Sequence, residues 1–185
     1  VAGVQSLADQ IRDTEKPTAA IVSDMAASAA YWLASQTDSI EANATAQIGS
    51  IGVYSVLVDS TEAHTEAGIR VHVVRSGDHK GSGVPGSPIT AEELAEEQRM
   101  IDQLAKMFSA SVADGRNMTP EQVAQIATGQ VWLAHDAQQL GLIDHIHGQE
   151  TAETNEPAEV ETMDPEIVAQ EPEEEETPEE ETPEE

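Results

Sequence analysis

The sequence of 185 residues contains no cysteine, and it has only two tryptophans, two tyrosines, one phenylalanine and eight lysines and arginines. Without cysteine there can be no disulfide and no thiolate metal ligand, so packing must stabilise any fold. The 36 acidic residues give a formal net charge of −28, which argues against nucleic-acid binding because few groups would neutralise phosphates. No apolar run approaches the roughly 20 residues of a membrane span, and no signal peptide is visible.

The acidic residues are concentrated toward the C-terminal end. Seventeen of them lie from Glu150 onward, a stretch dominated by Glu, Pro and Thr that contains no lysine or arginine. Such a composition has too few apolar groups to offset the entropy cost of ordering. We therefore expect a folded domain over residues 1–148 and a disordered acidic tail over residues 149–185. The tail is interpreted as a solubilising appendage or, alternatively, as a docking or scaffold segment.

Strand and helix patterns alternate along residues 1–148. Apolar and β-branched residues predict strands over 18–22, 39–42 and 69–74. Helical spacing and start or stop residues predict helices over 1–14, 26–35, 59–67, 120–129 and 134–140. Residues 46–52 are interpreted as a glycine-containing turn, and residues 53–58 as an apolar segment of undetermined type. This alternation predicts an α/β fold with a largely parallel sheet covered by helices.

One long helix is expected after residue 90. Thr90 and Glu93 have the spacing of a capping box, in which each side chain bonds the other residue's backbone N–H. Apolar residues then recur at helical spacing and are expected to form a buried stripe: Leu94, Met100, Ile101, Leu104, Met107, Phe108 and Val112.

Ser28 lies among alanines at the predicted start of a helix, and Lys80 follows in a glycine-rich loop. Taken singly, such a serine is ordinarily a small packing residue and such a lysine an ordinary solvated side chain. Small neighbours also let a substrate carbonyl approach a serine hydroxyl. A lysine can activate that hydroxyl when desolvation lowers the lysine pKa. The pair is thus a candidate nucleophile and base.

The histidines and glycines give no comparable signal. None of the six histidines stands in an HExxH or similar metal-binding spacing, and His145 and His147 alternate as strand residues do. A Ser-His-Asp triad stays open because triads are not local in sequence. The Gly49–Gly52 stretch lacks the ending of a phosphate loop, and Trp32 and Trp132 are expected in the core. We expect no metal and no cofactor.

Several segments occur together in one order: Asp24–Trp32, Gln47–Val53, Ser76–Lys80, Gly129–Leu133 and Ala137–Asp144. In this order they resemble the signal peptide peptidase A family over nearly all of residues 1–147. The resemblance is closest to the phage head-maturation protease branch, which shares the Ala-Ala-Ser-Ala-Ala-Tyr style of segment. That family is similar in fold to the Clp protease and crotonase superfamily, and it uses a Ser-Lys dyad.

By this resemblance Ser28 is the nucleophile, Lys80 the general base and Ser50 the hydroxyl that orients the lysine amine. Ala29 lies on the oxyanion and substrate side, where backbone N–H groups meet the developing charge. The amine must be neutral to accept a proton, so Asp78 is expected to point away from it. The family's Gly-Gly oxyanion segment and first core strands have no counterpart here. The chain begins at Val1 without an initiator Met, so we expect a fold incomplete at its N-terminus.

The resemblance implies a serine endopeptidase that forms an acyl-enzyme and cleaves capsid or scaffold proteins during phage head maturation. Its location would be the cytoplasm of an infected bacterium or the prohead, and it would act as a homo-oligomer. One alternative is a bacterial peptidase that degrades signal peptides and is anchored to the membrane through a missing N-terminal part. The other is an inactive, truncated module that serves assembly.

Overall fold

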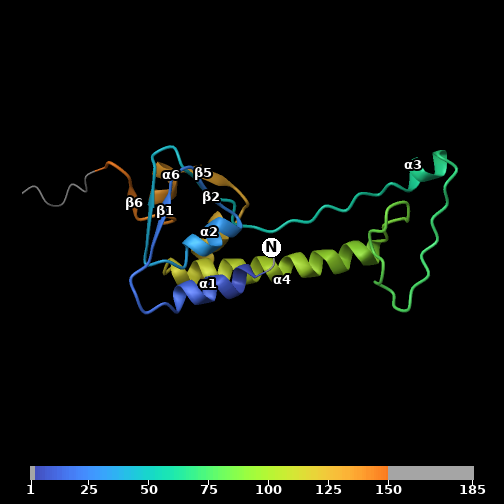
Figure 1. The fold of residues 1–185 in the computed structure, drawn as a ribbon, viewed down its shortest axis with the longest axis horizontal. Helices are drawn as coiled ribbons and strands as arrows, with labels where there is room; N and C mark the ends of the chain where they lie inside the picture. The colour runs from blue at the N-terminus through green and yellow to red at the C-terminus, as the bar shows by residue number, and fades with distance from the viewer. Residues whose placement is uncertain (1–2, 150–185) are drawn as a thin grey trace, which may run out of the picture. The chain divides into compact units, whose positions relative to one another are not determined.

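The computed structural model describes residues 3–149, which contain two three-stranded sheets with helices packed against them (Figure 1). The first sheet is fully parallel and has the order β1-β3-β6. Its strands are β1 (Ala19–Val22), β3 (Ser39–Ala42) and β6 (His145–Ile146). The predicted α/β class with parallel strands is confirmed, whereas the predicted acidic tail lies outside the described residues.

In the second sheet β2 is parallel to β4, and β4 is antiparallel to β5. These strands are β2 (Met25–Ala27), β4 (Gln47–Gly49) and β5 (Val131–Leu133). Two predictions are wrong here, because residues 26 and 27 of the helix predicted over 26–35 belong to β2, and residues 47–49 of the turn predicted over 46–52 form β4. The β2–β4 ladder explains both, since it begins with the Gln47 N–H donating to the Asp24 carbonyl oxygen at 2.8 Å.

Six helices lie within residues 3–149. They are α1 (Val4–Arg12), α2 (Ala29–Ala34), α3 (Thr61–Glu66), α4 (Ala91–Gly115), α5 (Pro120–Ile126) and α6 (Ala134–Gln139). Helix α2 contacts both α1 and α4. The expected capping box of Thr90 and Glu93 is present at the start of α4. Near the end of α4, a Cβ at Gly115 would collide with the Ser35 carbonyl, so this glycine permits the close approach of α4 to the residue that ends α2.

The predicted buried stripe of α4 is only partly buried. Phe108 and Val112 are enclosed, and Phe108 stacks on Trp32 with ring centroids 4.6 Å apart. The residues nearer the start of the helix are 42–51% exposed, namely Leu94, Met100, Leu104 and Met107. The prediction failed because only the C-terminal part of α4 lies against the core.

The chain between β4 and α3 is extended and has no partner strand. Among the described residues, Val53–Val58 make no backbone hydrogen bond. Residues 69–74 were predicted to be a strand, but they form no ladder either. β-branched residues favour extended backbone in both segments. A strand ladder, however, needs a neighbouring strand, and residues 3–149 place none beside either segment.

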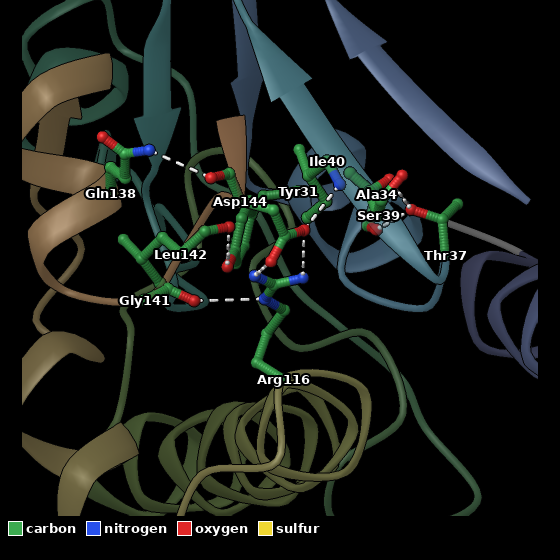
Figure 2. Close-up of polar contacts among 10 residues, drawn as sticks. All are labelled: Tyr31, Ala34, Thr37, Ser39, Ile40, Arg116, Gln138, Gly141, Leu142 and Asp144. Carbon is green, nitrogen blue, oxygen red and sulfur yellow. Dashed lines mark hydrogen bonds and ion pairs between the residues drawn. The ribbon is translucent and has the colours of Figure 1, made fainter. Parts of the chain in front are cut away.

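A partly buried polar network joins α2, β3, the end of α4 and the residues before β6 (Figure 2). The Arg116 guanidinium donates to both Asp144 carboxylate oxygens at 2.6 and 3.0 Å and to the Gly141 carbonyl oxygen at 3.1 Å. Asp144 also accepts the Ile40 N–H at 2.7 Å. The buried Tyr31 hydroxyl donates to the Leu142 carbonyl oxygen at 2.9 Å. The network therefore fixes α2, and with it the residue before α2, against both sheet and helix.

This network predicts a loss of stability in acid. Burial raises the pKa of the Asp144 carboxyl, but hydrogen bonds from Arg116 and Ile40 outweigh burial and hold that pKa below its usual range. A lowered folded-state pKa contributes stability above the unfolded pKa, and this contribution is lost as the pH falls below about 4.

We expect Asp144→Asn to lower the free energy of unfolding at pH 7 by about 2 kcal/mol, since it leaves the Arg116 charge buried without its partner. Urea unfolding at pH 7 and at pH 3.5 measures this, with the exposed-site change Asp102→Asn as control. The stability difference between wild type and Asp144→Asn should shrink in acid. An equal difference at both pH values would contradict the assignment to this carboxylate.

Candidate active site

Ser28 lies on a strained turn between β2 and α2. Its backbone has φ 56° and ψ −124°, a conformation that glycine adopts easily and other residues rarely do. The Ser28 N–H donates to the Gly49 carbonyl oxygen at 2.8 Å, and its own carbonyl accepts the Trp32 N–H at 3.0 Å. The side chain makes no cap hydrogen bond and the residue is exposed. Strained strand-to-helix turns of this kind present serine nucleophiles in hydrolases.

Ser50 directly follows the neighbouring strand β4, as Ser28 directly follows β2. The register pairs Ala27 with Gly49, so Ser28 and Ser50 each follow a paired residue at the same edge of the sheet. Ser50 also has a positive φ, 51°, and its N–H donates to the Gln130 carbonyl oxygen at 2.7 Å. The structure thus places these two predicted site residues at the ends of adjacent parallel strands.

A cavity of about 410 Å³ opens beside Ser28. Its walls come from the first turns of α1 and α2, from the start of the extended segment, and from α4. They include Ala29, Trp32, Gly52, Tyr54, Leu104, Met107 and Phe108. Among the described residues, no charged side chain lines this cavity, so it suits an uncharged, largely apolar group.

Of the two backbone N–H groups at the Ser28 turn, one is occupied and one is free of a backbone acceptor. The Ser28 N–H is already used by Gly49, whereas the Ala29 N–H donates to no backbone acceptor in the described part of the chain. Ala29 also lines the cavity. The first N–H groups of a helix have no partner within it, so the Ala29 N–H is open to an oxygen of a bound molecule.

Lys80 does not lie beside the Ser28 cavity. It lies on an exposed loop held by an Arg75 N–H that donates to the Asp78 carbonyl oxygen at 2.6 Å, and Arg75 also pairs with Glu93 at 3.3 Å. Leu104 of α4 lines the Ser28 cavity. Glu93 lies eleven positions before Leu104 on the same helix, which is roughly 16 Å along the helix axis. The Lys80 amine has no side-chain partner within residues 3–149. One chain therefore does not bring Lys80 to Ser28.

The remaining titratable residues form no second site. No group of three or more His, Asp or Glu within residues 3–149 is arranged to hold a metal ion. His145 and His147 are both exposed, and His147 contacts Glu41 at 2.7 Å. None of the helices described is long and apolar enough to cross a membrane.

Sequence reasoning missed most of the cavity walls. Trp32 was expected in the core, and it is buried, but one face also lines the cavity. Leu104 and Met107 were assigned to the buried stripe of α4 and prove to be half-exposed wall residues. Apolar periodicity alone carries no signal that separates a wall residue from a core residue.

Comparison with known proteins shows which protein family the chain resembles. The family model described as Peptidase family S49 matches residues 10–162. Protease 4 of Salmonella typhi is 33% identical over 144 residues, covering 73% of this chain and 22% of that protein. The chloroplastic serine protease SPPA of Arabidopsis thaliana is 28% identical over 134 residues, covering 72% and 20%.

Capsid assembly protease C of Escherichia phage lambda is 30% identical over 149 residues, covering 79% of this chain and 34% of that protein. The chain spans between 20% and 50% of the length of these and other curated relatives that it matches.

Proposed function

The chain belongs to peptidase family S49, and from this premise we propose that it is a serine endopeptidase whose nucleophile is Ser28 and whose general base is Lys80. The observation that carries the proposal is the strained, exposed Ser28 beside an uncharged cavity. A serine hydroxyl is a weak nucleophile until a base takes its proton. In the Ser-Lys dyad of the family that the sequence resembles, lysine is this base.

The proposed reaction runs through a covalent ester. The Ser28 Oγ attacks the substrate carbonyl carbon while its proton moves to the neutral Lys80 Nζ. The carbon–nitrogen bond then breaks, and the departing amine takes the proton from Lys80. Water next loses a proton to Lys80 as it attacks the ester, and the Ser28 Oγ takes that proton as it is released. The Ala29 N–H is the proposed donor to the negatively charged oxygen, because the Ser28 N–H is occupied by Gly49.

A homo-oligomer follows from this assignment. In one chain the Lys80 loop contacts the first turns of α4, whereas Ser28 faces residues further along that helix. Lysine acts as a base only where water is removed from its amine, and Lys80 is exposed. A second copy that places its Lys80 beside Ser28 would both complete the dyad and bury the amine.

Ser50 is proposed to hold the lysine amine in one orientation. It lies at the same sheet edge as Ser28, and its hydroxyl adds no charge. We expect Ser50→Ala to lower kcat about 10-fold and to leave KM within about 2-fold, since nucleophile and base remain. Steady-state kinetics on a peptide substrate measures this, with Ser23→Ala as a control, since Ser23 is an exposed serine that does not line the Ser28 cavity. A loss as large as that of Ser28→Ala would show that Ser50 does more than orient.

The proposed biological role is the processing of capsid or scaffold proteins during phage head maturation, in an infected bacterium or a prohead. The likeness to a phage capsid assembly protease favours this role. Likeness to Protease 4 favours the alternative of a bacterial peptidase that degrades signal peptides. Incubating the protein with candidate capsid and scaffold proteins, and separately with signal peptides, discriminates the two. The Ser28→Ala variant is the control, and cleavage of neither substrate class would favour an inactive assembly module.

A further inference from the structure

Met107 of α4 lies between two hollows. One is the cavity beside Ser28, and the other, of about 320 Å³, lies between α1 and α4. Met107 lines both hollows and is 45% exposed. A methionine side chain has three rotatable bonds and a polarizable thioether, so it can turn toward either hollow. Small solutes therefore reach the Met107 side chain from two sides, next to the proposed nucleophile.

The wall of the Ser28 cavity also includes a buried indole for whose N–H the described residues supply no acceptor. Trp32 is 8% exposed, and its Nε1–H makes no hydrogen bond within residues 3–149. Its ring stacks on Phe108, the residue after Met107 on α4. An unpaired buried donor costs stability. An acceptor brought to this wall would remove that cost.

We propose that Met107 is a site of reversible oxidation, at which the sulfoxide oxygen accepts the Trp32 indole N–H and closes the cavity beside Ser28. The thioether sulfur gives an electron pair to one oxygen of hydrogen peroxide as the O–O bond breaks. Sulfur is oxidised, the peroxide is reduced, and its second oxygen leaves as water with both protons. The proposal rests on the proposed function, because it describes the regulation of that same site.

Composition and position single out Met107 for this chemistry. The sequence has no cysteine, so methionine thioethers are the side chains most open to mild oxidation by peroxide. Met25 and Met100 are similarly exposed, at 57% and 46%, but neither lines the Ser28 cavity. Among the methionines in the described part of the chain, Met107 is the one whose oxidation adds a polar oxygen to that cavity.

Donors on the far side of Met107 are already engaged. In the hollow between α1 and α4, Gln5 Nε2 donates to the Asp9 carboxylate at 2.9 Å, and Arg12 pairs with the same carboxylate at 3.1 Å. A sulfoxide turned toward Arg12 would replace water at a partly exposed group and gain little. The Trp32 N–H has no such partner, so the oxygen gains a bond there without breaking another.

This bond makes the Ser28 cavity harder to fill. Trp32 satisfies the sulfoxide oxygen while the cavity is empty. A group that enters the cavity separates the two or buries the oxygen without a partner, at the cost of about one hydrogen bond. That cost corresponds to roughly a 10-fold rise in KM. Ser28 and Lys80 are chemically unchanged, so kcat should stay within about 2-fold.

The test follows the oxidation and the hydrogen bond separately from activity. The full chain is treated with dilute hydrogen peroxide, and mass spectrometry of its peptides measures the sulfoxide at each methionine. The indole N–H resonances of nitrogen-15-labelled protein report the hydrogen bond, with Trp132 as internal control because it does not line the Ser28 cavity. Met107→Leu is compared with Met100→Leu, and each protein is compared with its own untreated sample.

We expect oxidation to move the Trp32 indole proton downfield and to leave Trp132 in place. KM for a peptide substrate should rise about 10-fold in wild type and in Met100→Leu, and Met107→Leu should prevent both changes. Methionine sulfoxide reductases should restore the resonance and KM. Trp32→Phe, which keeps an aromatic ring against Phe108 and removes the donor, should limit the rise in KM to within about 2-fold.

Three results would overturn the proposal: Met100 oxidised while Met107 is not, a Met107 sulfoxide that leaves the Trp32 resonance in place, or an equal rise in KM in Met107→Leu. A shifted resonance with unchanged KM would also contradict it, since the cavity would then admit substrate as before. Failure of the proposed function is distinguishable, because the untreated protein would cleave no peptide while the indole resonance still shows whether the sulfoxide bonds Trp32.

Discussion

Replacing Ser28 by alanine should abolish peptide-bond cleavage, with kcat falling by about 10⁴-fold or more. The alanine removes the Oγ atom that we propose forms the ester, while the surrounding turn and its bond to Gly49 remain. The loss should therefore appear in kcat and in kcat/KM equally. Mass spectrometry of the wild-type protein during turnover should show an adduct that Ser28→Ala lacks.

Ser23→Ala is the matched control, since Ser23 is an exposed serine before β2 and does not line the Ser28 cavity. Circular dichroism and urea unfolding establish that Ser28→Ala keeps its fold. If a folded Ser28→Ala protein cleaved peptide at the wild-type rate, another nucleophile would have to be sought.

Replacing Lys80 by alanine should be nearly as damaging, because it removes the amine that we propose takes the Ser28 proton. The more informative experiment mixes two inactive proteins, Ser28→Ala and Lys80→Ala. When Lys80 acts on a different copy, mixed oligomers contain some sites with an intact serine beside an intact lysine. Activity should then return to about a quarter of the wild-type level at equal mixing, if each site pairs two randomly chosen copies.

Lys106→Ala serves as the matched control, since Lys106 lies on α4 away from the Ser28 cavity. Subunits are exchanged by dilution and reconcentration, and restored activity is followed against protein concentration. A mixture that stays inactive after subunit exchange would show that both residues must come from the same copy, which would require the Lys80 loop to move.

Local signals predicted much of the fold. The capping box of Thr90 and Glu93 marks the start of α4, and the apolar run near residue 20 gives β1, because both depend on neighbours in sequence. The error at Ala26 and Ala27 arose because alanine favours helix by intrinsic propensity. Pairing with β4, more than twenty residues further along the chain, overrides that preference.

The residue types of the proposed site come from the sequence, whereas their arrangement in space does not. Ser28 and Ser50 are neighbours only through the register of β2 with β4, which no local pattern encodes. The exposure of Leu104 depends on how far the core extends along α4. The location of Lys80 depends on a long excursion between β4 and α4 that packs against the start of the helix.

The positive φ values of Ser28 and Ser50 have a consequence for how such a chain would evolve without its activity. Each non-glycine residue in this backbone region costs about 1–3 kcal/mol, which glycine would largely recover. A lineage that kept the fold only for assembly would gain stability by drifting to glycine at both positions. Backbone energetics alone would therefore favour glycine at both positions, so the two serines supply their hydroxyl groups at a cost in stability.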